Sequence, residues 1–233
     1  MMKTSFLTEL LDLISPRSCP ICGSRLAASE SVICGVCHFR MPLTGFAKAP
    51  YDNPLARLFW GQFPIEKAIA YFYFVPHSDT GRLIYNLKYH HQPDIGENMG
   101  RIIANELPPP RFFDDIDAIV PVPITRKRHW QRGYNQSMEI ARGISDVTHL
   151  PILKKVIKRT HFNISQTKKK GWERQENVEN AFQLLRPEVV RDRHLLLVDD
   201  IVTTGATIRA CAKELCKAGN VRISVFSLGF TKK

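Results

Sequence analysis

The chain has 233 residues, a length that fits one medium-sized domain or one domain with a small accessory module. Hydrophobic residues make up 44% of it, the ordinary fraction for a globular protein, so a buried core can form. The 33 Lys and Arg against 22 Asp and Glu give a formal charge of +11, which indicates a polyanionic partner or a phosphorylated ligand.

The first segment, residues 1–15, has a short apolar run that also contains Glu9 and Asp12. It lacks the basic start and the small-residue cleavage site of a signal peptide, so we expect an amphipathic helix. No stretch of the sequence approaches the ~20 apolar residues that a membrane-spanning helix needs. We therefore expect a cytoplasmic protein that does not insert into membranes.

Two C-x2-C pairs follow, Cys19 with Cys22 and Cys34 with Cys37, separated by eleven residues. Each pair lies in a tight turn that directs two sulfurs at one point, and two such turns complete a tetrahedron of thiolates around Zn²⁺. Two disulfides are the alternative, which a reducing cytosol disfavours. The spacing favours a structural zinc site, because four thiolates leave no open position for substrate, and His38 is then a bystander.

The rest of the chain alternates between strand and helix patterns. Residues 42–64 are rich in Pro, Gly and aromatic residues and are interpreted as a linker that packs on another part of the protein. Strands are expected over residues 67–75, 116–122, 152–158, 194–198 and 222–228, helices over residues 79–90, 96–107, 134–147 and 206–219, and a basic loop between 122 and 134. Near-continuous apolar strands alternating with helices predict a parallel sheet covered on both faces. Cys211 and Cys216 fall in the last helix and are interpreted as small core residues.

The sequence LLLVDDIVTTGAT at residues 195–207 carries the clearest functional signal, because its apolar strand ends in Asp199 and Asp200. In an open parallel sheet, ligands bind beyond the carboxyl ends of the strands. Gly205 allows close approach of the backbone, and the amides at the start of the next helix favour a phosphate. A sugar phosphate fits both the carboxylates and the amides, because its ribose hydroxyls can donate to the carboxylates while the amides hold its phosphate. An ordinary strand-to-helix turn, the alternative, explains one Asp and one Thr but not the whole run.

This run resembles the phosphoribosyl pyrophosphate (PRPP) motif of type I phosphoribosyltransferases. Three further segments narrow the resemblance to the ComF family of competence-associated proteins: VPVPITRKRHWQRGYNQSMEIA at 120–141, ISQTKKKGWERQENVENAF at 164–182 and NLKYH at 86–90. Members of this family also carry an N-terminal four-cysteine knuckle, so the resemblance extends from Cys19 to the end of the chain. One departure is Asn163, which stands where the family has Thr three residues before Gln166.

The resemblance implies a type I phosphoribosyltransferase-like fold over residues 46–233. This is a parallel sheet with helices on both faces, preceded by an amphipathic helix and a zinc-ribbon knuckle in residues 1–45. It implies a PRPP site in which Mg²⁺ bridges pyrophosphate and ribose oxygens, with Asp199, Asp200, Lys127 and Arg128 as the catalytic groups. The implied PRPP-binding set is Asp199, Asp200, Thr203, Thr204, Gly205, Ala206, Thr207, Lys127 and Arg128, with Gln166 and Arg174 on a mobile flap.

By the resemblance, the basic loop after residues 119–123 is the pyrophosphate loop. The residues that follow it have two open interpretations: Arg132, Gly133, Asn135 and Gln136. They cap the next helix or they contact the ligand.

Cations and aromatic residues are interleaved in two stretches, residues 121–134 and 154–172. Cations that follow a phosphate backbone beside rings that stack on bases are typical of single-stranded DNA binding. The candidate DNA contacts are Arg126, Arg132, Lys168, Lys169, Lys170 and Trp172. The alternative is that the cations serve pyrophosphate and the aromatic residues pack the flap against the sheet.

Three classes of function are compatible with these residues. The first is a ComF-type factor in DNA uptake or utilisation, which combines a PRPP site with single-stranded DNA and with proteins of the uptake machinery. The second is a metabolic phosphoribosyltransferase (a pentosyl transferase) acting on a nucleobase or amine, for which the sequence identifies no acceptor pocket. The third is a catalytically silent PRPP sensor. The knuckle, the charge and the extent of the resemblance favour the first.

Overall fold

The computed structural model describes residues 16–107, 112–160 and 181–231. The predicted N-terminal helix and the predicted flap contacts lie outside these ranges: Gln166, Arg174, Lys168, Lys169, Lys170 and Trp172. Among the described residues, no helix combines the length and the apolar character needed to cross a lipid bilayer.

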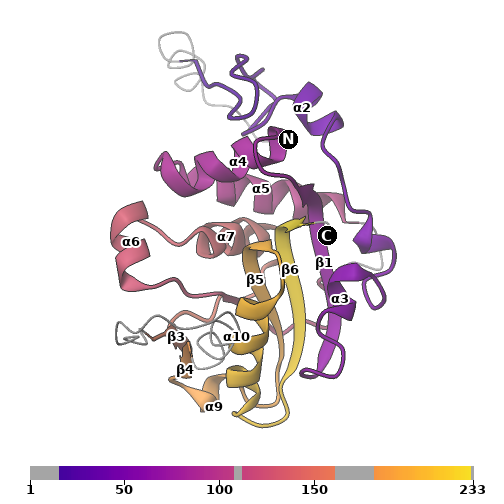
Figure 1. The fold of residues 1–233 in the computed structure, drawn as a ribbon, viewed down its shortest axis with the longest axis vertical. Helices are drawn as coiled ribbons and strands as arrows, with labels where there is room; N and C mark the ends of the chain where they lie inside the picture. The colour runs from indigo at the N-terminus through magenta and orange to yellow at the C-terminus, as the bar shows by residue number, and fades with distance from the viewer. Residues whose placement is uncertain (1–15, 108–111, 161–180, 232–233) are drawn as a thin grey trace, which may run out of the picture.

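A four-stranded parallel sheet in the order β1-β6-β5-β2 forms the centre of the protein (Figure 1). Its strands are β1 (Ile65–Phe74), β2 (Ala118–Pro121), β5 (His194–Val202) and β6 (Arg222–Thr231). All four residues of β2 are buried, as are the first five of β5. Such continuous apolar runs are expected where both faces of a parallel sheet are covered.

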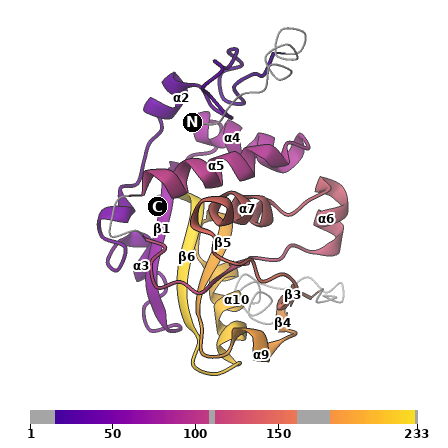
Figure 2. The same cartoon turned by 180° about the vertical axis from the view of Figure 1, so that it is seen from behind.

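Helices cover both faces of this sheet. In Figure 1, α10 (Ala206–Cys216) lies in front of the strands, and the reverse view in Figure 2 shows α5 (Pro93–Glu106) and α7 (Gln136–Thr148) on the opposite side. Gly100 and Gly143 let α5 and α7 cross closely, because a Cβ at either position would collide with the backbone of the other helix. The predicted fold class is confirmed.

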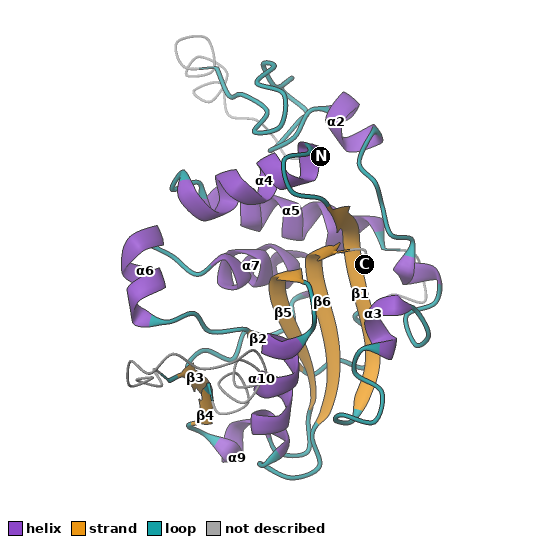
Figure 3. Ribbon diagram, viewed as in Figure 1, coloured by secondary structure: helices purple, strands orange, loops and turns teal. Residues whose placement is uncertain are grey.

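Shorter elements complete the architecture (Figure 3). They are α2 (Gly35–Phe39), the 3₁₀ helix η1 (Phe46–Lys48), α3 (Pro54–Arg57), α4 (Asp79–Tyr89), α6 (Arg126–Arg132), α9 (Pro187–Val190) and the antiparallel pair β3 (Ile157–Arg159) and β4 (Phe182–Leu184). The linker does pack on another element, since Leu43 bridges to Phe72 of β1 and the Tyr73 N–H donates to the Pro42 carbonyl at 2.8 Å.

Several predicted elements differ from the structure, and three of the differences affect the site. The basic stretch after β2 is not a loop: it forms helix α6, capped by the Thr125 hydroxyl, which accepts from the Arg128 N–H. Strand β5 extends to Val202, because its backbone remains paired with β6 beyond the apolar run. The strand expected at 152–158 is reduced to residues 157–159, with an isolated bridge from Ile152 to Ile119.

Candidate functional site

The two adjacent carboxylates lie in the last part of β5, at the carboxyl edge of the sheet. Asp199 Oδ1 accepts hydrogen bonds from the Ser137 hydroxyl at 3.2 Å and from the Asp200 N–H at 2.9 Å. Asp200 Oδ2 lies 3.0 Å from Lys88 Nζ, in an ion pair whose side chains are 14% and 20% exposed. Lys88 belongs to α4 and Ser137 to α7, so two helices that are distant in sequence hold the acid pair in place.

Burial and the neighbouring charge of Asp200 raise the pKa of Asp199 to about 7. Lys88 and the Ser137 hydroxyl oppose this increase but do not cancel it. Near neutral pH, Asp199 can therefore exchange a proton, whereas an ordinary aspartate is fully ionised.

The loop after β5 leads directly into α10. Gly205 is the N-terminal cap residue of that helix and adopts φ = 75°, a left-handed conformation that favours glycine. A Cβ at Gly205 would meet the ring of buried Phe59 at 2.7 Å, so the linker supports the loop from behind. Thr203 and Thr204 are exposed, and the Ala206 N–H at the start of α10 donates to the Thr204 hydroxyl over a long 3.4 Å. The N-terminus of α10 favours an anion.

One cavity of about 320 Å³ joins these features, and we call it the central cavity. Its lining includes the acid pair, Asp199 and Asp200, together with Thr207 of α10. Four cations also line it: Lys88, which pairs with Asp200, and Arg128, Arg132 and Arg159. Of the two cations predicted for the pyrophosphate, Arg128 lines the cavity and Lys127 does not.

Several cations lie close together in the lining of the cavity and favour binding of an anion. The pKa of Arg159 is lowered by burial and by the positive charge of Arg128, and Asp199 only partly offsets this effect. The sequence placed Arg159 in a DNA-binding stretch and gave no sign of its position beside the acid pair. Lys88 and Ser137 were also missed, although NLKYH was already recognised as a family element.

Of the four residues with two open interpretations, Asn135 caps the next helix, α7, by accepting from the Ser137 N–H at 3.2 Å. Gly133 instead ends the preceding helix, α6, with φ = 78°, which neither interpretation foresaw. Arg132 and Gln136 instead line the central cavity, and Arg132 Nη1 donates to Gln136 Oε1 at 2.8 Å. The Gln136 Nε2 is buried and finds no hydrogen-bond partner within the described part of the chain. A shift of the Gln136 side chain would be needed before this donor reaches a ligand in the cavity.

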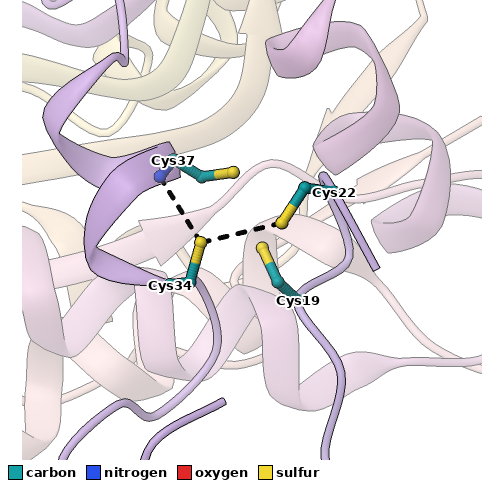
Figure 4. A group of neighbouring side chains, drawn as sticks. All are labelled: Cys19, Cys22, Cys34 and Cys37. Atoms are coloured by element: carbon teal, nitrogen blue, oxygen red, sulfur yellow. Dashed lines mark hydrogen bonds between the residues drawn. The ribbon is translucent and has the colours of Figure 1, made fainter. Parts of the chain in front are cut away.

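The four predicted metal ligands come together at one point (Figure 4). The Sγ atoms of Cys19, Cys22, Cys34 and Cys37 all lie within 4.8 Å of one another. The separation of 3.7 Å between Cys22 and Cys34 matches the roughly 3.8 Å expected between thiolates that share one tetrahedral ion. These residues fit a four-thiolate metal site.

Hydrogen bonds around the cysteines favour this arrangement. The Cys37 N–H donates to Cys34 Sγ at 3.5 Å, and Ser24 lowers the pKa of Cys22 to about 6 through side-chain and backbone hydrogen bonds, whereas burial raises the pKa of Cys37. A lowered pKa favours the thiolate, which is the form that binds metal. His38 is a bystander as predicted, since its Nε2 lies 2.8 Å from the Tyr71 hydroxyl.

The two remaining cysteines lie elsewhere. Cys211 is fully buried in α10, and Cys216 is partly buried at the end of that helix. Both packing positions agree with the interpretation as small core residues.

Comparisons with known proteins were made for sequence and for structure. No protein-family model matches the chain. The DNA utilization protein YhgH of Escherichia coli K12 is 29% identical over 226 residues, which cover 93% of this chain and 98% of the relative. Competence protein F of Haemophilus influenzae is 35% identical over 113 residues, which cover 48% of this chain and 49% of the relative. Competence protein ComFC of Bacillus subtilis is 31% identical over 111 residues, which cover 47% and 43%.

Among solved structures, glutamine PRPP amidotransferase from B. subtilis, complexed with ADP and GMP, aligns with a TM-score of 0.40 and 19% identity. The alignment covers 60% of this chain and 30% of that one. A second structure, of the allosteric regulatory enzyme of purine biosynthesis, also aligns with a TM-score of 0.40.

The raised pKa of Asp199 predicts a pH-dependent cost to stability. Because the folded state binds this proton more tightly than the unfolded chain, the carboxyl destabilises the fold increasingly as pH rises from about 4 to about 7. Asp199→Asn removes this cost. We expect the variant to melt several degrees above the unchanged protein at pH 8 and to lose most of that advantage at pH 5, at about 3 °C per kcal/mol.

Differential scanning fluorimetry of both proteins across this pH range measures the difference directly. Glu188→Gln, which changes an exposed carboxylate outside the central cavity, is the control and should show a small, constant difference. A melting-temperature advantage of Asp199→Asn that does not change with pH would contradict the assignment.

Proposed function

This chain belongs to the ComF family of competence-associated proteins, and we propose that it binds PRPP in the central cavity and handles single-stranded DNA. The observation that carries the PRPP proposal is the arrangement of charge around one cavity. Two carboxylates, the first turn of α10 and four cations line the same cavity, and one of the cations, Lys88, pairs with Asp200. PRPP presents ribose hydroxyls, a 5′-phosphate and a pyrophosphate, which match these groups one by one.

In the proposed binding mode, the ribose hydroxyls donate to Asp199 and Asp200. The 5′-phosphate lies against the amides of residues 203–207, where the dipole of α10 adds positive potential. The pyrophosphate lies against Arg128, Arg132 and Arg159, and the unpartnered Gln136 Nε2 donates to one of its oxygens once its side chain has shifted. The same cations stabilise the negative charge that grows on pyrophosphate when its bond to C1′ breaks.

Mg²⁺ is part of this proposal, and the donor set fits it. The ion prefers oxygen ligands and keeps several waters, so it is typically held by one or two carboxylates together with substrate phosphates. Asp199 and Asp200 are the carboxylates among the described residues that line the cavity, and they would orient the ion through the ribose hydroxyls or through water. When bound, the ion would neutralise charge on the pyrophosphate.

The DNA half of the proposal is supported by helix α6. Its residues Arg126 and Lys127 lie outside the lining of the central cavity, and Trp130 is 87% exposed. A large exposed ring beside cations that do not line the cavity has the composition of a surface that stacks on bases and follows phosphates. The names of the relatives, which refer to DNA utilization and competence, agree with this role.

The remaining predictions belong to the same proposal. Lys168, Lys169, Lys170 and Trp172 extend the DNA contacts, and Gln166 and Arg174 contact PRPP from the flap. The chain divides into residues 1–45 and 46–233, acts in the cytoplasm and meets proteins of the DNA-uptake machinery.

We also propose that the metal held by the four cysteines is zinc. Four thiolates suit Zn²⁺ and leave no open position, so the ion is structural. The segment around the cysteines is too short to build a large core of its own, and a metal supplies the missing folding energy.

The first prediction concerns PRPP. The double change Asp199→Asn with Asp200→Asn keeps the side-chain shapes but removes the charged acceptors for two hydroxyls. At about 1.5–3 kcal/mol for each hydrogen bond to a charged group, we expect at least a hundredfold loss of PRPP affinity in the presence of Mg²⁺. Isothermal calorimetry measures the affinity, thermal melting confirms the fold, and Glu188→Gln is the control. Undiminished PRPP binding by the double variant would rule the proposal out.

The second prediction concerns DNA. Binding of a fluorescein-labelled oligothymidine should weaken steeply as salt rises. Arg126→Ala with Lys127→Ala should lower the log–log salt slope by about 1.4, at about 0.7 for each phosphate that the variant no longer neutralises. Trp130→Ala should weaken binding about tenfold at an unchanged slope, because it removes stacking and no charge. Lys48→Ala, an exposed lysine in the linker, is the control.

Fluorescence anisotropy at several salt concentrations gives both quantities. If the unchanged protein does not bind the oligonucleotide at low salt, or if the α6 variants have the salt slope and affinity of the control, α6 is not the DNA surface.

The third prediction concerns the metal. Elemental analysis of the purified protein should find one zinc per chain, and Cys34→Ser should lower both zinc content and melting temperature. Cys216→Ser, which changes a cysteine outside the cluster, should retain the zinc. Four titratable free thiols in a folded, zinc-free protein would refute the site.

A further inference from the structure

A second cavity, of about 690 Å³, lies between α6, α7 and the first residues of α5. We call it the α6–α7 groove. Pro123, Ile124 and Arg132 line both this groove and the central cavity, so the two are contiguous. The acid pair of β5 lines only the central cavity. In Figures 1 and 2, α6 lies at the edge of the molecule, next to α7.

Positive charge dominates the lining of the α6–α7 groove. Arg132, Arg142 and Lys154 are its three cations, and Glu139 is its only carboxylate among the described residues. Glu139 pairs with Arg142, and the two side chains are 5% and 48% exposed. The negative charge is therefore buried and already paired, whereas the guanidinium of Arg142 still reaches solvent and keeps further N–H donors.

Other donors of the groove have no partner in the described part of the chain. Lys154 is exposed and forms no ion pair with a described carboxylate. His91 and His129 are also exposed, and neither imidazole has a hydrogen-bond partner among the described residues. Even a neutral imidazole keeps one N–H donor. These side chains can therefore donate to an anion without breaking an existing contact.

The size of the groove favours a chain of phosphates over a single phosphate. Its volume is about twice the 320 Å³ of the central cavity, so one phosphate would leave most of it unfilled. Apolar side chains alternate with the cations in its lining, including Pro93, Pro123 and Met138. Such a mixture suits a sugar–phosphate backbone, because the sugars contact the apolar side chains and the phosphates contact the cations.

Helix α6 connects the groove to the surface already proposed for DNA. His129 and Arg132 lie three residues apart, on the face of α6 toward the groove. Lys127 and Trp130 are likewise three residues apart and line neither cavity. A strand whose bases stack on Trp130 can thus continue with its phosphates around α6 into the groove.

We infer that the α6–α7 groove binds the sugar–phosphate backbone of single-stranded DNA. The inference rests on the DNA half of the proposed function and adds contacts that the sequence did not indicate, since Arg132 is the one groove residue among the predicted DNA contacts. Because the groove adjoins the central cavity without including its acid pair, a strand held there lies beside bound PRPP and does not displace it.

The experiment measures binding to the full chain by fluorescence anisotropy at several salt concentrations. The probes are a fluorescein-labelled oligothymidine and an abasic deoxyribose-phosphate oligomer of the same length, each without PRPP and with saturating PRPP and Mg²⁺. The test variant is Lys154→Gln, because Lys154 lines the groove and not the central cavity, and Lys154→Arg retains the charge. Lys155→Gln is the matched control, since Lys155 is an exposed neighbouring lysine that lines neither cavity.

We expect Lys154→Gln to lower the log–log salt slope by about 0.7 for both oligomers, with and without PRPP, because one phosphate contact is lost. Lys154→Arg and Lys155→Gln should keep the slope of the unchanged protein, and thermal melting confirms that each variant is folded.

Three results would overturn the inference. If Lys154→Gln and Lys155→Gln have the same slope while the unchanged chain binds DNA, the groove is not the path of the strand, although the proposed DNA function stands. If the unchanged chain binds neither oligomer at low salt, the proposed DNA function and the inference both fail. If Lys154→Gln weakens only the binding of inorganic pyrophosphate, measured by calorimetry with PRPP present, the groove holds a free anion and not DNA.

Discussion

The site depends on the cost of holding two neighbouring carboxylates at a partly buried edge of the sheet. Their mutual repulsion and their burial both disfavour ionisation, as the raised pKa of Asp199 records. Lys88 and Ser137 reduce this cost, and each belongs to a different helix. The acid pair therefore fixes where α4 and α7 must meet β5, and the position of the central cavity follows from that meeting.

The cations that line the central cavity carry an imbalance of opposite sign. Burial and the positive charge of Arg128 lower the pKa of Arg159. A ligand with hydroxyls at one end and phosphates at the other compensates both sides at once, whereas a simple phosphate compensates only the cations. This pairing of two opposite imbalances argues for a phosphorylated sugar more strongly than the loop before α10 alone, because many helix N-termini accept a phosphate.

Short sequence motifs predicted correctly those features that depend on neighbouring residues in the chain. The apolar run before Asp199 predicted a central strand, and the two C-x2-C turns predicted a cluster whose four sulfurs do lie within 4.8 Å of one another. Lys88, Ser137 and Arg159 could not be placed in the same way, because their roles arise from contacts between elements far apart in the chain. Helix α6 was mistaken for a loop because its seven residues bury nothing and so show no apolar periodicity.

Helix α4 contacts the cysteine knuckle and also carries residues of the site. Asn86 Nδ2 donates to the carbonyl of Pro20, inside the first C-x2-C turn, at 2.6 Å. Asn86 lies next to Tyr85 and two residues before Lys88, and both main views place the knuckle segment beside this helix (Figures 1 and 2). A metal that fixes the turn around Pro20 thereby fixes the partner of α4, and α4 in turn carries the lysine that pairs with Asp200. A metal held by the four cysteines would have no open position for chemistry, but through the hydrogen bond from Asn86 it would help to hold α4 and Lys88 in place.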